Sequence, residues 1–305
     1  MSTHPNRTLL VTGASGHLGR RVVELLLEAG ETGIIAASRT PEKLVGWPTD
    51  RVEVRYADFD DPVSLATAFT GVSRLLLIST DALGVPRLRL RQHHAAVSAA
   101  EQAGVSHVIY TSLTSPEPGT PVAIAPDHFG TETALSESTL GYTVLRNNIY
   151  METLIGTVSQ ALGLGGTICK ATGDGRAAYV SREDCARAAA TALAEDFDGR
   201  RTLDVSGPEA VSQADVARIA SELLGTPIVY QPQPLNALVD SMVHAGLPRP
   251  VAEVIASFDA GIAAGKFEGV SSAVGDLTGH PPTSAANFLA AHRAAFTAPT
   301  PSETH

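Results

Sequence analysis

The sequence predicts a doubly wound α/β fold, in which helices cover both faces of a parallel sheet, followed by a smaller C-terminal lobe. Strand-like and helix-like segments alternate through the first 150 residues. Most of the strand-like segments are apolar on both faces, as expected for strands that are buried on both sides of a parallel sheet. A glycine-rich turn follows the first of them, at residues 13–19. Together these observations indicate the doubly wound arrangement.

The elements of the first half follow from the spacing of apolar residues. Short β-prone runs predict strands, and apolar residues at helical spacing predict helices, several of which end at a glycine. The strands are expected at residues 8–12, 33–38, 52–57, 74–79, 107–112 and 143–146. The helices are expected at about residues 20–29, 65–69, 86–103 and 127–138.

The alternation weakens after residue 150. A helix is expected at residues 185–193, a strand at 202–206, and a further helix that Ser212 caps, with Asp215 at its third position. Five prolines between residues 227 and 250 predict a loop-rich region with short helices over the carboxyl edge of the sheet. The expected divisions are a core of residues 1–155 rejoined by 176–207, a lobe of 208–296 with 156–175, and a frayed tail of 297–305.

Composition excludes several classes of function. The 305 residues carry a formal net charge of −10 without long basic runs, which disfavours nucleic-acid binding. The N-terminus has no apolar signal region, and no apolar run approaches the ~20 residues that span a membrane. We therefore expect a cytoplasmic protein that does not bind membranes. Cys169 and Cys185 have neither CxxC spacing nor a histidine at metal-site spacing, so we expect no metal.

The glycine turn Gly13-Ala14-Ser15-Gly16-His17-Leu18-Gly19 lies between an apolar strand and an amphipathic helix. Backbone amides at the start of a helix can hold a pyrophosphate, and glycine lets the backbone approach it closely. The spacing differs from GxGxxG, and a purely structural tight turn would use the same residues. The strand–turn–helix context favours dinucleotide binding.

The end of the second strand indicates which dinucleotide is bound. NAD enzymes usually place a carboxylate there, whereas this chain has Ser38 and Arg39, with Lys43 one turn later. A guanidinium suits the 2′-phosphate of NADP(H), so NADP(H) is the expected cofactor. The alternative is a solvated arginine.

Other candidate cofactor contacts follow the third, fourth and fifth strands, whose ends should border the same crevice. Asp58 fits a contact with the edge of the adenine, and its alternative role is to cap a loop. The hydroxyl groups at the later strand ends have the alternative role of ordinary strand caps. The candidates are Asp58, Phe59, Ile78, Ser79, Thr80, Thr111 and Ser112.

The acid–base pair of most short-chain dehydrogenases is absent. Lys43, Lys170 and Lys266 are the only lysines, and none follows a tyrosine by four residues. The helix that would carry the pair instead has His128 and Glu132, which share a face. A neighbouring carboxylate could raise the pKa of His128 and make it a proton donor. Alternatively, the two side chains form a surface pair or help to seat the nicotinamide ribose.

Polar residues also follow the sixth strand, where they should lie over the nicotinamide end. Asn147, Asn148 and Ile149 are candidate cofactor contacts. Asn148 can bond an amide or a substrate carbonyl, and Tyr150 can stack on a flat substrate or donate its hydroxyl, so both are catalytic candidates. The alternative is a loop in which the asparagines close turns.

These segments resemble the NmrA-like branch of atypical short-chain dehydrogenases, and within it the type 2 NADPH:quinone oxidoreductases and triphenylmethane reductases. The resemblance covers nearly the whole chain. The matching segments are residues 11–19, 37–39, 75–79, 110–113, 127–128 with 131–132, 145–150, 171–175 and 243–247.

The resemblance implies a Rossmann domain that binds NADPH, with a small C-terminal substrate lobe. It implies hydride transfer to a quinone or a related conjugated carbonyl or dye, without flavin or metal. It assigns Gly13, Ser15, Gly16, Leu18, Gly19 and Arg39 to the phosphates, and Ser79 with residues 147–150 to the nicotinamide end. Asn148 and Ile149 stand where the quinone reductase pattern has Gly-Trp, so the pocket wall differs.

Such an acceptor delocalises the incoming charge, which fits the missing Tyr–Lys pair. Two other functions stay open: a non-catalytic NADP-sensing regulator, and a secondary-metabolism reductase acting on a polycyclic substrate. We expect an aromatic or quinoid small-molecule substrate, and a monomer or homodimer.

Overall fold

The computed structural model describes residues 7–297, and its centre is a seven-stranded sheet in the order β3-β2-β1-β4-β5-β6-β9. Every neighbouring pair in this sheet is parallel. The strands are β1 Leu9–Val11, β2 Ile34–Ser38, β3 Val52–Tyr56, β4 Arg74–Leu77, β5 His107–Leu113, β6 Gly141–Asn147 and β9 Arg200–Val205. The strand order reverses direction between β1 and β4, which confirms the predicted doubly wound fold.

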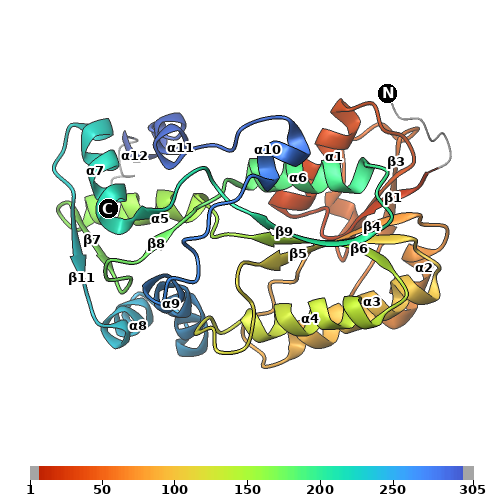
Figure 1. Ribbon diagram of the computed structural model, residues 1–305, viewed down its shortest axis with the longest axis horizontal. Helices are drawn as coiled ribbons and strands as arrows, with labels where there is room; N and C mark the ends of the chain where they lie inside the picture. The colour runs from red at the N-terminus through yellow and green to blue at the C-terminus, as the bar shows by residue number, and fades with distance from the viewer. Residues whose placement is uncertain (1–6, 298–305) are drawn as a thin grey trace, which may run out of the picture.

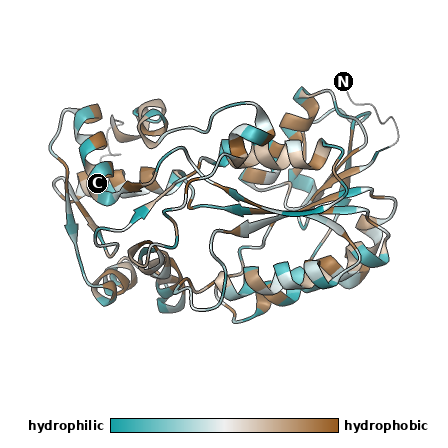
Figure 2. Cartoon of the chain, viewed as in Figure 1, coloured by the Kyte–Doolittle hydropathy of each residue, from teal (hydrophilic) through white to brown (hydrophobic). Residues whose placement is uncertain are grey.

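Helices cover both faces of the sheet (Figure 1). One face carries α1 His17–Glu28, α6 Arg182–Ala194 and α10 Ala273–Thr278. The other carries α2 Pro62–Phe69, α3 Leu88–Gln102 and α4 Ala125–Glu137, and a short 3-10 helix, η1, spans Pro41–Lys43. Because of this double cover, every residue of β1, β2, β4 and β5 is buried. Most helices carry both hydrophobic and hydrophilic residues, as amphipathic helices do (Figure 2).

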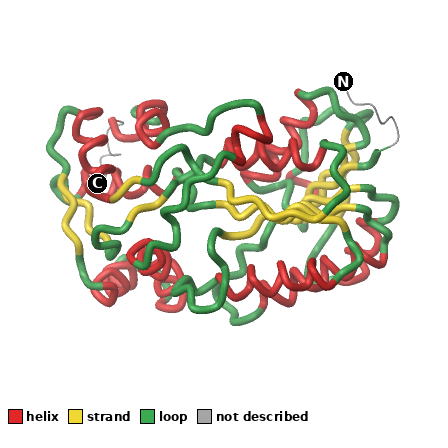
Figure 3. Tube along the Cα trace, viewed as in Figure 1, coloured by secondary structure: helices red, strands yellow, loops and turns green. Residues whose placement is uncertain are grey.

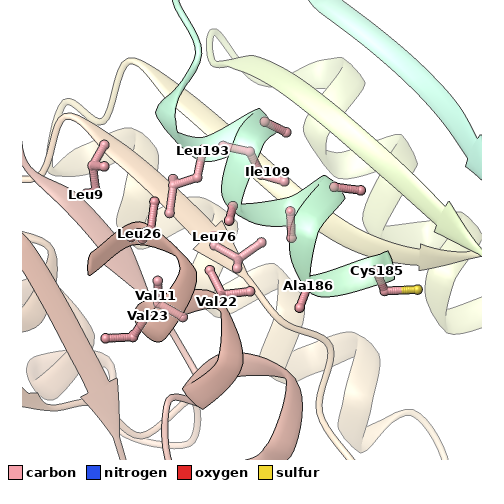
Figure 4. Packing of buried hydrophobic residues seen from close by; sticks show 14 of the residues in the cluster. Leu9, Val11, Val22, Val23, Leu26, Leu76, Ile109, Cys185, Ala186 and Leu193 are labelled. Atoms are coloured by element: carbon pink, nitrogen blue, oxygen red, sulfur yellow. The ribbon is translucent and has the colours of Figure 1, made fainter. Parts of the chain in front are cut away.

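The face with α1 and α6 has a tightly packed apolar core. Figure 4 shows side chains from β1, β4, β5, α1 and α6 meeting there. Helix α6 contributes mainly alanines, whose small side chains let it approach the sheet closely. Arg74 of β4 is buried beneath the C-terminal end of α6 and donates to the backbone oxygens of Leu193, Ala192 and Phe197. Two of these bonds satisfy carbonyls of the last turn of α6, which have no partner within the helix, and the third is to the loop that follows.

The opposite face contains a buried polar network. Thr80 N–H donates to His93 Nε2 at 3.0 Å, so His93 Nδ1 carries the proton and donates to Thr131 Oγ1 at 2.9 Å. Nearby, Arg89 Nη2 donates to His128 Nε2, and His128 Nδ1 donates to the Tyr110 hydroxyl. Arg89, His93, Tyr110, His128 and Thr131 are all buried, so their hydrogen bonds replace those that water would make.

The C-terminal half consists of helices around two short strand pairs (Figure 3). Strands β7 Thr167–Lys170 and β11 Val229–Pro232 pair in parallel, and β8 Arg176–Ala177 pairs antiparallel with β10 Val211–Ser212. The helices are α5 Glu152–Gly163, α7 Gln213–Leu224, α8 Leu235–His244, α9 Arg249–Ala263, α11 Ala285–Ala291 and α12 Ala294–Thr297. Ser212 caps α7 and forms a capping box with Asp215, as predicted.

The predicted loop-rich region is wrong for residues 235–263. Helices α8 and α9 occupy most of that segment, and α9 has 15 residues. The prolines that indicated loops lie at the helix starts: Pro234 precedes α8, Pro248 precedes α9, and Pro250 lies in its first turn. A proline at the start of a helix lacks an N–H that would have no partner in the helix in any case.

The end of the chain returns to the central sheet. Helix α10 packs against α6 and β9, while α11 packs against α7. Residues 208–296 therefore contact both halves of the molecule, and the proposed division into core and lobe stays a prediction. The tail predicted at residues 297–305 lies outside the described residues except for Thr297. Among the described helices, none is long and apolar enough to cross a membrane.

Candidate functional site

A cavity of about 570 Å³ opens where β1, β2, β4 and β5 end, at the switch point of the sheet. The predicted residues that line it are Gly13, Ser15, Gly16, His17, Leu18, Gly19, Ser38, Arg39, Phe59, Ile78, Ser79, Thr80, Thr111 and Tyr150. The lining residues that the prediction missed are Thr12, Ala37, Ala57, Asp81, Gln92 and Arg182. The predicted residues that do not line it are Ala14, Lys43, Asp58, Ser112, His128, Asn147, Asn148 and Ile149.

The glycine turn is shaped for a close approach. Gly13 has a φ of +60°, a conformation that side chains disfavour. A Cβ on Gly19 would lie 2.4 Å from the Gly13 carbonyl oxygen, so only glycine fits there. The side chain of Ala14 is buried, and its N–H donates to Ala37 O at 3.0 Å, which ties the turn to β2. A backbone this open at a helix start fits a pyrophosphate.

Thr12 joins the two strands at the switch point. Its hydroxyl donates to Leu76 O at 3.0 Å and accepts from Ile78 N–H at 2.9 Å. These bonds hold the end of β1 against the end of β4 and so fix the opening in which the turn lies. Thr12 lies in the segment 11–19 that carries the family resemblance, but it was not among the predicted site residues.

The end of β2 forms the adenosine side of the cavity. Ser38 Oγ lies 2.7 Å from Ser15 Oγ and accepts from Thr40 N–H, which fixes the chain on either side of Arg39. Arg39 is 63% exposed and has only a loose ion pair with Asp81, at 3.8 Å. Its guanidinium is therefore available for a 2′-phosphate.

Two predicted contacts on this side lie elsewhere. Lys43 is exposed outside the cavity, and its carbonyl accepts from Arg20 Nη2 at 3.0 Å. Asp58 caps its own loop, with Oδ1 accepting from Asp60 N–H at 3.0 Å, and the contact predicted with the adenine edge stays a prediction. Phe59, the next residue, lines the cavity instead.

The cavity floor follows β4 and β5. Ser79 N–H donates to Thr111 Oγ1 at 2.9 Å, and the N–H of Thr80 is held by His93. Two buried polar atoms in this wall, Thr80 Oγ1 and Gln92 Oε1, have no hydrogen-bond partner among the residues described. Unpartnered polar atoms in a cavity wall fit a site that receives polar groups of a ligand.

The predicted role of His128 is not supported. Glu132 does not face it: that carboxylate accepts from Arg146 at 2.7 Å and from the Ser112 hydroxyl at 2.5 Å. His128 is only 3% exposed, and burial together with the charge of Arg89 lowers its pKa well below the usual value. The expectation that Glu132 raises this pKa is wrong, and the imidazole is neutral at pH 7. Ser112 is likewise turned away from the cavity, toward Glu132.

Asn147, the last residue of β6, and the two residues after it make contacts within the chain, and their predicted cofactor contacts stay predictions. Asn148 Nδ2 donates to Phe267 O at 3.0 Å, and its Oδ1 accepts from Ile149 N–H at 2.8 Å. Both polar atoms of its side-chain amide are thus hydrogen-bonded within the chain, and the catalytic role predicted for Asn148 is not supported. Ile149 packs against the core of the C-terminal half, and Asn147 Nδ2 donates to the Tyr150 hydroxyl at 3.2 Å.

Tyr150 does reach the cavity. Burial raises the pKa of its phenol, which therefore keeps its proton at neutral pH. Its ring lies under the Arg182 guanidinium, with 5.4 Å between the arginine Cζ and the ring centroid. The sequence did not identify Arg182, because only the packing of α6 on α1 brings it here. Within residues 7–297, no cluster of metal-ligating side chains was found.

A parallel sheet whose switch point holds a glycine turn, a cavity of about 570 Å³ and an available arginine defines a nucleotide-binding α/β protein. The model of the NAD(P)H-binding family matches residues 13–196, and the chain belongs to this family. The matched segment runs from the glycine turn to the end of α6, and so includes every strand of the sheet from β2 to β6.

Several similar proteins are reductases. Quinone oxidoreductase 2 of Escherichia coli K12 is 33% identical over 92% of this chain and 97% of its own. The solved structure of that enzyme with NADPH has a TM-score of 0.87 at 32% identity, covering 93% of this chain and 99% of the other. The NAD(P)H azoreductase of Xenophilus azovorans is 28% identical over 94% of this chain and 99% of its own.

A solved structure of a second reductase is also similar to this chain. The triphenylmethane reductase of Citrobacter sp., solved with NADP(H), has a TM-score of 0.83 at 34% identity and covers 92% of this chain and 97% of the other. These findings confirm the predicted fold, the predicted family and the class of activity, which is that of an NAD(P)H-dependent oxidoreductase.

Proposed function

We propose that this protein is an NADPH-dependent reductase that delivers a hydride to a quinone or to a related conjugated carbonyl or dye. One observation carries the proposal: at the Tyr150 end of the cavity, the described residues place no Tyr–Lys pair and no exposed histidine that could donate a proton. Tyr150 has a raised pKa, and the nearby His93 has a pKa lowered by burial to about 3. The relatives described above, which reduce quinones, azo compounds or triphenylmethane dyes, support it.

The lack of a proton donor beside the acceptor determines which acceptors the protein can reduce. Bound NADPH supplies a hydride, and reduction of a simple ketone then needs a proton donor for the alkoxide that forms. A quinone instead becomes a stabilised phenolate, and a triarylmethane cation becomes neutral, so neither needs a strong acid at the moment of transfer. The protein's contribution is then to hold donor and acceptor in reacting geometry.

Tyr150 is the side chain that best fits the acceptor side. Its ring borders the cavity, and its hydroxyl is fixed by Asn147 at 3.2 Å. A fixed ring can stack on a flat acceptor at little entropic cost. Asn148 and His128 are not proposed to touch the acceptor, because both are bonded inside the chain.

The test is a set of acceptors mixed with protein and NADPH, followed by the fall in absorbance of NADPH. We expect quinones and triarylmethane dyes to be reduced, and simple aliphatic ketones to react at least 100-fold more slowly, the usual contribution of a general acid being about 10²–10⁴-fold. Equal rates for both classes would contradict the proposal. Tight NADPH binding without turnover of any acceptor would favour the sensor instead.

Arg39 is proposed to select NADPH over NADH. Arg39→Ala should weaken NADPH binding by ~1.5–3 kcal/mol, the value of a hydrogen bond to a charged group, and leave NADH nearly unchanged. Equal losses for the two cofactors would show that Arg39 does not contact the 2′-phosphate. The cytoplasmic location, the oligomeric state and the identity of the physiological acceptor stay predictions from the sequence.

A further inference from the structure

The two edges of the central sheet differ in how they are covered. At one edge, the chain returns over β9: the Ser271 hydroxyl donates to Asp204 O, Ser271 N–H donates to Ser206 Oγ, and α10 packs against the strand. The other edge is β3 (Figure 1), and no strand within residues 7–297 pairs with its outer side. An uncovered edge leaves backbone groups available to another strand.

The outward backbone groups of β3 belong to its even-numbered residues. Ala57 N–H, directly after the strand, donates to Ser38 O of β2 at 3.1 Å, so the odd-numbered residues are the ones that bond to β2. The backbone groups of successive residues in a strand point to opposite sides. Those of Val54 and Tyr56 therefore point away from the sheet.

The side chains of β3 have different chemistry on the two faces of the sheet. On one face, Val54 is 40% exposed and Tyr56 is 47% exposed, although edge strands usually carry lysine or proline to prevent pairing. On the other face, Arg55 donates to Glu53 at 2.7 Å and to Ala68 O of α2 at 2.7 Å. The strand thus presents apolar side chains on one face, and one acid and one base on the other.

The strand Val52-Glu53-Val54-Arg55-Tyr56 is complementary to itself when two copies run antiparallel about Val54. Glu53 then lies opposite Arg55 of the second copy, and Val52 lies opposite its Tyr56. Opposite charges and pairs of aromatic with β-branched residues are the cross-strand pairs that stabilise sheets. Centring the pair on Glu53 or on Arg55 would place like charges opposite each other, so the charges specify the register about Val54.

We propose that β3 is a dimerisation surface, on which a second copy of this chain extends the sheet across a two-fold axis at Val54. Val54 N–H would donate to Val54 O of the second copy, and Tyr56 N–H to its Val52 O, each reciprocally. Val52 N–H takes no part, because it donates to Pro48 O at 2.9 Å. A groove of about 610 Å³, lined by residues of β3 and α2, leaves the strand accessible. The inference holds for any hydride acceptor.

Sedimentation velocity of the whole chain over a series of concentrations measures the dissociation constant of the dimer. We expect a Kd of about 1–100 µM, as for an interface at the small end of the size range. Glu53→Arg replaces both attractive charge pairs by like-charge pairs and should raise the Kd about 10-fold or more. Val54→Pro removes an N–H that points away from the sheet, which an edge strand tolerates, and should have a similar effect. Glu222→Arg, at an exposed position on α7, is the matched control and should leave the Kd within about twofold.

Mixing two variants tests the charge pairing directly. Arg55→Glu alone should also be monomeric, because it places glutamates opposite each other. An equimolar mixture of Glu53→Arg and Arg55→Glu should form a heterodimer, since each charge then meets its opposite. Mixing would not repair a structural defect in either variant. If Arg55→Glu fails to fold after losing its bond to α2, Glu53→Arg and Val54→Pro decide the proposal.

A wild-type protein that stays monomeric up to about 1 mM would overturn the proposal and leave this edge to solvent or to a different protein. A wild-type dimer whose Kd changes in neither Glu53→Arg nor Val54→Pro would overturn it as well, because the contact would then lie elsewhere on the molecule. An equal rise of the Kd in Glu222→Arg would show a general effect of charge and would also contradict the assignment to β3.

Discussion

The two faces of the central sheet are built from different chemistry. On the α1–α6 face, apolar side chains fill the core and the charged groups lie at its ends, in Arg74 beneath α6 and Arg182 at its start. On the α3–α4 face, charged and polar groups lie within the core, in the network that includes His93 and His128. Side chains of catalytic type can thus be structural when they are buried, whereas an arginine at a helix start that the sequence did not single out lines the cavity.

The largest expected effect tests the α1–α6 face. Arg74→Met should lower the free energy of unfolding by ~3–5 kcal/mol, because three backbone oxygens, two of them in buried hydrogen bonds, lose their donor. Chemical denaturation measures it. Arg51→Met is the matched control: Arg51 also donates to backbone oxygens but is only half-buried, and its loss should cost less than about 1.5 kcal/mol. Equal costs would mean that burial does not set the difference.

The second effect tests the opposite face. His128→Leu should cost ~2–4 kcal/mol of stability, because Arg89 and Tyr110 each lose a buried partner. The turnover number with a quinone should stay within about threefold of the wild type, a change well below the ~10²-fold loss of a general acid. His94→Leu, at an exposed neighbouring position, is the control for stability. A 100-fold loss of turnover with stability intact would restore a catalytic role for His128.

The third effect is the response of this polar face to acid. Burial lowers the pKa of His93 to about 3 and that of His128 well below its usual value, so both are neutral when folded. In the unfolded chain both histidines take up protons below about pH 6.5, and this protonation stabilises the unfolded state relative to the folded state. Unfolding free energy should therefore fall by about 1 kcal/mol per pH unit for each histidine between pH 6 and 5. The slope should be smaller in His128→Leu, and an equal slope would show that His128 does not titrate with unfolding.

The smallest effect concerns the ion pairs between α1 and α6. Glu183→Gln removes the partner that Arg21 and Arg187 share, but these side chains are partly exposed and Arg21 keeps two other glutamates. The expected cost is ~0.5–1 kcal/mol, as for other exposed pairs, and it should shrink in high salt. A salt-independent loss of several kcal/mol would mean that the pair, rather than the apolar packing, holds the two helices together.

The features that the sequence predicted well are local ones. The glycine turn, Ser38 with Arg39, and the cap of α7 each depend on neighbouring residues, and all lie where they were expected. The fold also follows from local periodicity, because strands buried on both faces must be apolar throughout.

The features that it missed depend on contacts between distant segments. Helical spacing places His128 and Glu132 on one face but does not reveal that β6 supplies Arg146 to Glu132. Similarly, the side-chain amide of Asn148 donates to Phe267 O, more than a hundred residues away along the chain. Arg182 gains its place only when α6 packs on α1. None of these partners has a signature in the local sequence.

Helix α10 has a consequence for how the protein is made. Val274 is buried in the cluster that α1 and α6 form with the sheet, and Leu277 packs against the same cluster. Helix α6 and strand β9 are complete by residue 205, but the surface on them that α10 covers stays open until residues 273–278 have been synthesised. During that interval the nascent chain exposes an apolar surface of the kind that chaperones bind. Removing α10 would thus expose apolar side chains of the cluster that α1 and α6 form with the sheet.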